Sequence, residues 1–205
     1  QVTLPFSSTT YLERYEGMAV KVMQPLYVTE NYNLGRGGLL DLSSDGRLMQ
    51  PTQVVTPGTP ANDMAQQNDL DRVILDDGST KQNPDPIIYP RPYLSATNSI
   101  RSGDIVSDIV GVLTYSWSGW GGTDAYRIHP TDDPTIINRN PRPTSAPDVE
   151  GDLKVVSLNV YNYFDTFSGC TEGVGGSPTG CRGADDATEF TRQRDKIINA
   201  IVQMN

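Results

Sequence analysis

Cys170 and Cys181 are the only two cysteines of the chain, and His129 is its only histidine. The cysteines share one short loop rich in Gly, Ser, Thr and Pro, and no further ligand with zinc-site spacing lies nearby. This pattern favours a disulfide over two free thiols. A single histidine argues against a catalytic triad or a histidine-based metal site, so His129 is interpreted as a strand-end residue before Pro130.

Aromatic and arginine side chains offer a second chemistry, in which rings stack on a flat ligand and cations neutralise phosphate. They could bind single-stranded nucleic acid or an oligosaccharide. Alternatively, the aromatic rings pack the ends of a barrel and the arginines are only solvated. The candidates are Tyr32, Arg36, Arg47, Tyr115, Trp117, Trp120 and Arg127.

The charge of the chain restricts this chemistry. Its 205 residues carry 16 Lys/Arg and 25 Asp/Glu, a formal net charge of -9, and the acidic excess is spread along the whole sequence. An acidic surface repels phosphate backbones at long range, which argues against a dedicated high-affinity DNA-binding protein. Any nucleic-acid contact must come from a local basic patch, a metal ion or stacking.

Short strands joined by turns are expected to position these side chains, because Gly and Pro are frequent. Alternating apolar residues and turn signals predict strands, with long loops between them. Gly111, midway along a long strand, suggests the bend that a five-stranded barrel needs. The predicted strands are two within residues 17–32 around Pro25, then 39–42, 73–75, 103–117 and 125–131; residues 50–70 are expected to form a long loop, and the proline-rich residues 82–94 a surface segment outside the core.

The C-terminal part has a different pattern. Residues 139–152 have linker composition, and residues 153–160 are predicted to form a buried strand. Asp186 followed by Glu189 is a capping box that predicts a helix. Its apolar stripe consists of Phe190, Ile197, Ile198, Ile201 and Val202.

Two stretches of this tail carry a family resemblance. LKVVSLNVYNYFDTF, from Leu153, and RGADDATEFTRQRDKIINAI, after the cysteine loop, are similar to the start of the endonuclease/exonuclease/phosphatase domain of large secreted bacterial nucleases. The preceding region, with YLERYEGMAVKV, GDIVSDIVGVLTYSW and AYRIHPT, resembles the OB-fold-like domain that precedes the catalytic domain in the same proteins. The resemblance implies an OB-fold-like barrel domain over residues 1–138, a Pro-rich linker over 139–152, and, over 153–205, the first strand and helix of a truncated four-layer α/β sandwich.

In that superfamily, phosphodiester hydrolysis uses a divalent metal, usually Mg²⁺, and the first strand ends in an asparagine that helps to arrange the metal site. Asn159 matches this asparagine, whereas without the resemblance it would be interpreted as a turn cap. The remaining metal ligands have no counterparts in this sequence. Since one neutral amide cannot activate a metal-bound water, the chain alone is expected to be inactive.

The leading functional expectation is therefore part of an extracellular nuclease that degrades DNA, with the barrel as an accessory domain. Its partner would be the remainder of the catalytic domain, because an isolated strand and helix cannot bury both faces of the strand. One alternative is a stand-alone OB-type module that binds single-stranded nucleic acid or oligosaccharide. Another is a phosphodiesterase of the same superfamily acting on a different phosphoester.

No stretch approaches the roughly 20 apolar residues of a membrane span. The N-terminus QVTLPFSS lacks the pattern of a signal peptide, so we expect the chain to start after any signal and the protein to be secreted, extracellular or at the cell surface.

Overall fold

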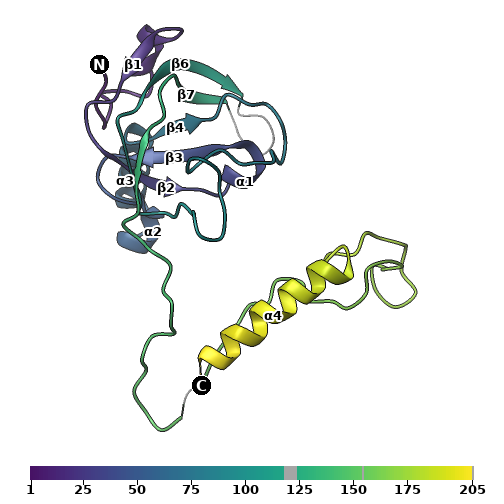
Figure 1. Cartoon of the computed structure of the whole chain (residues 1–205). Coiled ribbons are helices and arrows are strands. Elements are labelled where there is room, and N and C mark those ends of the chain that lie inside the picture. The colour runs from purple at the N-terminus through teal and green to yellow at the C-terminus, as the bar shows by residue number, and fades with distance from the viewer. Residues whose placement is uncertain (118–123, 154, 205) are drawn as a thin grey trace. The chain divides into compact units, whose positions relative to one another are not determined.

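The computed structural model describes residues 1–117, 124–153 and 155–204, and these form two compact units, residues 1–141 and 142–205 (Figure 1). The boundary falls inside the proline-rich segment that the sequence marks as a linker. A buried carboxylate explains why the first unit extends this far. Asp104 accepts hydrogen bonds from the backbone N–H groups of Arg139 and Asn140, at 2.8 and 2.9 Å, and so fixes the end of the unit to its core.

The first unit is rich in strands, as its composition predicts. One curled, mixed sheet contains them all, with short helices in the connections. The strands are β1 (Ala19–Lys21), β2 (Leu26–Glu30), β3 (Leu39–Ser43), β4 (Val73–Asp76), β5 (Ile105–Ser107), β6 (Val110–Trp117), β7 (Asp124–Pro130) and β8 (Thr135–Ile137); the helices are the 3-10 helix η1 (Tyr11–Tyr15), α1 (Leu34–Gly37), α2 (Pro51–Val54) and α3 (Thr59–Leu70).

The strand order in the sheet is β1-β6-β7-β4-β3-β2-β5-β8. Strands β2, β3 and β4 form an antiparallel meander, β4 runs parallel to β7, and β7 pairs antiparallel with β6. Only Asp108 and Ile109 separate β5 from β6, yet β5 pairs with β2 and β6 pairs with β7. The sheet therefore curls, because one bent stretch of chain joins both of its arms.

The bend lies at Asp108, which has a positive φ of 58°, and not at Gly111 as the sequence suggests. Gly111 has another role, because it lies between two neighbours, paired with Val20 of β1 and Pro130 of β7. A Cβ atom at this position would lie 2.3 Å from the carbonyl oxygen of His129. Glycine is therefore needed here for close backbone approach.

The core of the first unit lies inside the curled sheet. The alternating residues Val20, Val22, Leu26 and Val28 are all buried, as predicted. The proline-rich segment 82–94 was expected to stay outside the core, and this is wrong for Tyr89, whose ring is only 2% exposed within the core cluster. Burial of one aromatic ring does not require a strand, so prolines in the backbone do not prevent it.

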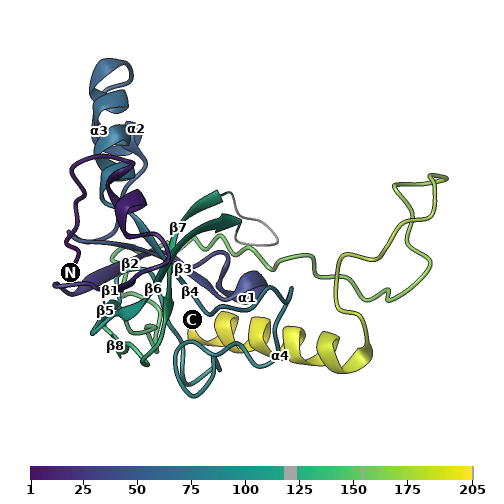
Figure 2. The same cartoon turned by 90° about the horizontal axis from the view of Figure 1, so that it is seen from above.

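The prediction of a long loop over residues 50–70 is wrong, because this stretch contains the helices α2 and α3, which lie side by side (Figures 1 and 2). Each helix has a proline in its first turn, where a missing N–H costs no hydrogen bond. Ala61 is the only buried residue of α3. Because α3 buries so little of its surface, its sequence has no regular spacing of apolar residues from which a helix could be predicted.

The second unit contains α4 (Ala187–Gln203), which begins where the capping box predicts. Asp186 accepts hydrogen bonds from the backbone N–H groups of Thr188 and Glu189, at 2.7 and 2.8 Å. The predicted strand over residues 153–160 is wrong: its described residues belong to no strand, and Leu153 and Val155 are more than 80% exposed. A strand needs a hydrogen-bonded neighbour, and the described part of this unit supplies none.

None of the helices among the described residues is long and apolar enough to cross a membrane.

Candidate functional site

The residues that the sequence nominates for nucleic-acid binding do not gather at one place. Tyr32 follows β2 and is 81% exposed, and Arg36 is exposed on α1. Tyr115 and Trp117 share one face of β6 at alternate positions and are about half exposed. Arg47 is exposed in the connection after β3, and Trp120 lies outside the described residues.

Arg127 is not available to a ligand, and its nomination is corrected. Its side chain is fully buried and forms an ion pair with Asp76, with 3.0 Å between Nη1 and Oδ2. It also donates to the carbonyl oxygen of Ser116. A buried guanidinium must have partners, and these groups supply them.

His129 extends the same network. Its Nε2 lies 3.0 Å from the hydroxyl of Thr114, and its Nδ1 lies 3.6 Å from Asp76 Oδ1. The residue belongs to β7, next to Pro130, as predicted. The described contacts therefore give His129 a structural setting between two strands.

A groove in the first unit was not anticipated. It consists of two adjoining hollows of about 740 and 190 Å³, and Asp69 and Arg72 line both of them. The larger hollow is bounded by the connection after β3 and by α2 and α3. The smaller is bounded by the N-terminal segment, β4, β6 and β7. We call the two together the α3 groove.

A tyrosine pair forms one end of the α3 groove. The rings of Tyr115 and Tyr126 lie 4.9 Å apart between centroids, tilted by 60°, and each tyrosine also meets a glutamate. The hydroxyl of Tyr126 donates to Glu13, and the backbone N–H of Tyr115 donates to Glu16. The hydrogen bond to Glu13, followed by burial, raises the pKa of Tyr126 to about 12. The tyrosine pair therefore makes this end of the groove aromatic.

Amide side chains form the other end of the groove. Gln50, Gln53 and Asn62 line it and are exposed, and within the described residues no hydrogen bond occupies their side chains. The Asn68 amide, by contrast, donates to the carbonyl oxygen of Met49.

Charges along the α3 groove are balanced. Two basic and two acidic residues line the larger hollow: Arg47, Arg72, Glu30 and Asp69. Arg72 also lies 3.7 Å from the carboxylate of Asp41. The lining of the groove therefore carries no formal net charge.

Asn159, the residue nominated for catalysis, lies in a turn of the second unit. Its Oδ1 accepts a hydrogen bond of 2.9 Å from the backbone N–H of Tyr161. Tyr161 and Asn162 both adopt positive φ, and the side-chain amide of Gln193 donates to the carbonyl oxygens of Val160 and Tyr161. Gln193 of helix α4 therefore fixes the turn, and the side-chain oxygen of Asn159 is already used to cap it.

Basic side chains surround Asn159 in a hollow of about 550 Å³. Arg182, Arg192 and Lys196 line it, and so does Arg142 at the start of the unit, whereas Glu189 is the only acidic residue in the lining. Among the described residues no ion pair engages these four cations. We call this site the basic pocket.

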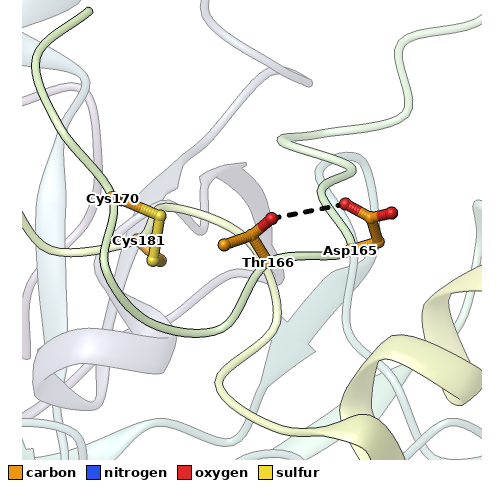
Figure 3. Close-up of a disulfide and its surroundings, with 4 residues drawn as sticks. All are labelled: Asp165, Thr166, Cys170 and Cys181. Atoms are coloured by element: carbon orange, nitrogen blue, oxygen red, sulfur yellow. Dashed lines mark hydrogen bonds between the residues drawn. A yellow bond between two sulfur atoms is a disulfide. The ribbon is translucent and has the colours of Figure 1, made fainter. Parts of the chain in front are cut away.

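The predicted disulfide between Cys170 and Cys181 is confirmed (Figure 3). It closes a small hairpin in which Thr171 and Pro178 form an isolated bridge and Thr179 donates to the Cys170 carbonyl oxygen. Asp165 and Thr166 lie beside it, joined by a hydrogen bond (Figure 3). The cysteines are therefore structural.

Metal ligands do not cluster in the parts of the chain that the structure describes: no group of three or more His, Cys, Asp or Glu side chains could hold an ion. Asn159 with Glu189 and four cations is a donor set for anions and does not fit Mg²⁺. Comparison with family models, curated proteins and solved structures finds no match to this chain.

Sequence reasoning missed both sites for identifiable reasons. The amides of the α3 groove lie in the stretch interpreted as a loop. The cations of the basic pocket are spread along the sequence, and the spacing of Arg192 and Lys196, which places both on one face of a helix, was the only local signal.

Proposed function

We propose that the chain is part of an extracellular, metal-dependent nuclease that hydrolyses phosphodiester bonds of DNA. Residues 142–205 would belong to its catalytic module, and residues 1–141 would be an accessory domain. The observation that carries the proposal is the basic pocket beside Asn159, the one residue to which the family resemblance assigns a catalytic role.

The chemistry of the basic pocket suits a phosphodiester. Arginine presents a planar fork that matches phosphate oxygens, and lysine adds a point charge. Arg182, Arg192 and Lys196 therefore give a local positive charge in a chain whose overall charge is -9. The Nδ2 group of Asn159 can donate to a phosphate oxygen, while its Oδ1 remains bonded to the turn. We assign to this pocket only the binding and orientation of the phosphate.

The metal of the proposed nuclease needs ligands beyond this pocket, because its donor set does not fit Mg²⁺. We propose that they come from further polypeptide of the catalytic module. The apolar surface of the second unit supports such a partner: Leu153, Val155, Ile201 and Val202 are each more than half exposed. Covering these side chains with further polypeptide would remove their apolar surface from water.

The strand pairing supports an OB-type barrel for residues 1–141. If β5 and β6 count as one bent strand, the chain passes through five strands in the order β2, β3, β4, β5–β6 and β7. The fourth of these, β5–β6, pairs through β5 with the first, β2. That arrangement agrees with a five-stranded, partly open barrel. Strands β1 and β8 would then be additions at its edges.

A plasmid-cleavage assay with Mg²⁺ tests the proposal on the secreted protein that contains this sequence. Loss of one preorganised hydrogen-bond donor typically lowers kcat by about 10²–10³. We expect Asn159→Ala to approach this range and the double variant Arg192→Gln/Lys196→Gln to raise KM. A polypeptide that ends at Asn205 should not cleave.

Arg194→Gln is the matched control, because Arg194 lies on the same helix, pairs with Asp195 and does not line the pocket. Robust cleavage by the 205-residue chain, abolished by Asn159→Ala, would refute our account of the missing ligands. Turnover of a lipid or nucleotide phosphoester, with plasmid untouched, would keep the superfamily and change the substrate.

A further inference from the structure

We propose that the α3 groove of residues 1–141 is a binding site for a neutral oligosaccharide. The inference concerns a different unit from the basic pocket and does not depend on the nuclease assignment. Three features of the groove carry it: the tyrosine pair, the free amides and the charge balance.

The tyrosine pair provides a stacking platform. Tyr115 is 48% exposed, and the ring of Tyr126 lies against it at 4.9 Å. A pyranose ring has a face of C–H groups, and such a face packs on an aromatic ring by dispersion and loss of water contact. The hydrogen bond from the Tyr126 hydroxyl to Glu13 fixes the orientation of the Tyr126 ring in addition to its contact with Tyr115. Little conformational entropy is then lost when a ligand stacks.

The amides provide the matching polar contacts. Gln50, Gln53 and Asn62 each offer an acceptor oxygen and two donor hydrogens, and sugar hydroxyls both donate and accept. All three line the larger hollow, and because Asp69 and Arg72 line both hollows, one extended ligand can reach the amides and the tyrosine pair.

The charge balance selects against a polyanion. Glu30 and Asp69 line the groove together with Arg47 and Arg72, so the formal charges of its lining cancel. Arg72 is also close to Asp41, so a phosphate chain laid along the groove would find no net positive charge to bind it. A neutral ligand needs no such charge. For that reason the groove favours a sugar chain over single-stranded DNA.

Calorimetric titration of the 205-residue chain tests the inference. The probes are the hexasaccharides of cellulose, chitin and starch, with an oligothymidylate as the nucleic-acid probe. We expect at least one hexasaccharide to bind, with an affinity that changes little with salt concentration, and the oligothymidylate not to bind at the groove.

Two variants and a control assign the site. Tyr115→Ala removes the platform, and Gln53→Ala/Asn62→Ala removes exposed amides without touching the core. Each should weaken binding by about tenfold or more, as loss of a central contact does. Tyr93→Ala is the control, because Tyr93 is 52% exposed and does not line the groove.

Three outcomes would overturn the inference: no hexasaccharide binds at millimolar concentration, the control weakens binding as much as both groove variants, or the oligothymidylate binds and both groove variants abolish this binding. Because the amide variant lies on exposed helices, a folding defect in Tyr115→Ala would not decide the result alone.

Discussion

Two arginines of the first unit and two of the second have opposite settings. In residues 1–141, Arg127 is buried against Asp76, and Arg72 lies close to Asp41. In residues 142–205, Arg182 and Arg192 line the basic pocket without an ion pair among the described residues. An acidic composition in both units therefore does not determine the electrostatic potential at a particular site. What matters is whether each cation meets its carboxylate in the fold.

The units differ equally in how they bury apolar residues. The first unit has a continuous core built from its strands and N-terminal segment. In the second, Ala184 is the only buried residue among those described, and aromatic contacts such as Tyr163 on Phe190 replace a core.

Amide hydrogen exchange should show the largest contrast. Core strands exchange through global unfolding, which costs about 5 kcal/mol or more, so amides of β3 and β4 should be slowed more than about a thousandfold. Residues 155–168, which have no regular structure, should exchange near the rate of an open chain. Equal protection in both regions would mean that the second unit has a covered core.

The buried ion pair should matter far more than an exposed one. Asp76→Ala leaves the Arg127 guanidinium buried without its carboxylate partner, so unit 1 should lose about 3–5 kcal/mol of unfolding free energy. In contrast, Asp195→Ala breaks the half-exposed pair with Arg194 and should cost no more than about 1 kcal/mol. Urea denaturation followed by the signals of each unit measures both, and similar losses would contradict the difference in burial.

Removal of the disulfide should affect only the second unit. Cross-linking a loop of this size stabilises it by roughly 2–3 kcal/mol, so Cys170→Ser/Cys181→Ser should expose the hairpin to proteolysis up to about a hundredfold faster. The melting temperature of unit 1 serves as the internal control and should not change. An unchanged cleavage rate would show that the hairpin hydrogen bonds suffice.

The smallest effect is a pKa change at the tyrosine pair. Glu13→Gln should lower the pKa of Tyr126 from about 12 towards its ordinary value of 10.0, because the carboxylate no longer holds the neutral phenol. Tyr89 is the control, since burial raises its pKa to about 12 and Glu13 is not among the causes. Ultraviolet difference titration reports both phenols.

The same two phenols determine a pH dependence. Their folded pKa values exceed the unfolded value, so their contribution to stability is complete below about pH 10 and is lost as the pH rises to about 12. Unit 1 should therefore lose stability over this window, and Tyr89→Phe should reduce the slope.

Features that depend on neighbours along the chain could be predicted from the amino-acid sequence. Alternation placed Val20, Val22, Leu26 and Val28 in the core, and the capping box placed the start of α4 at Asp186. The position of the two cysteines in one short glycine-rich loop predicted the disulfide between them. Each of these signals acts within a few residues, so composition and spacing are enough to read it.

Features that depend on partners far away in the sequence became visible in the three-dimensional fold. The described residues of the apolar run at 153–160 form no strand, because a strand requires an edge to pair with. Arg127 is buried because Asp76 lies on a strand that runs parallel to its own. The α3 groove and the basic pocket likewise form from segments far apart in the sequence, and their charge depends on which side chains the fold brings together.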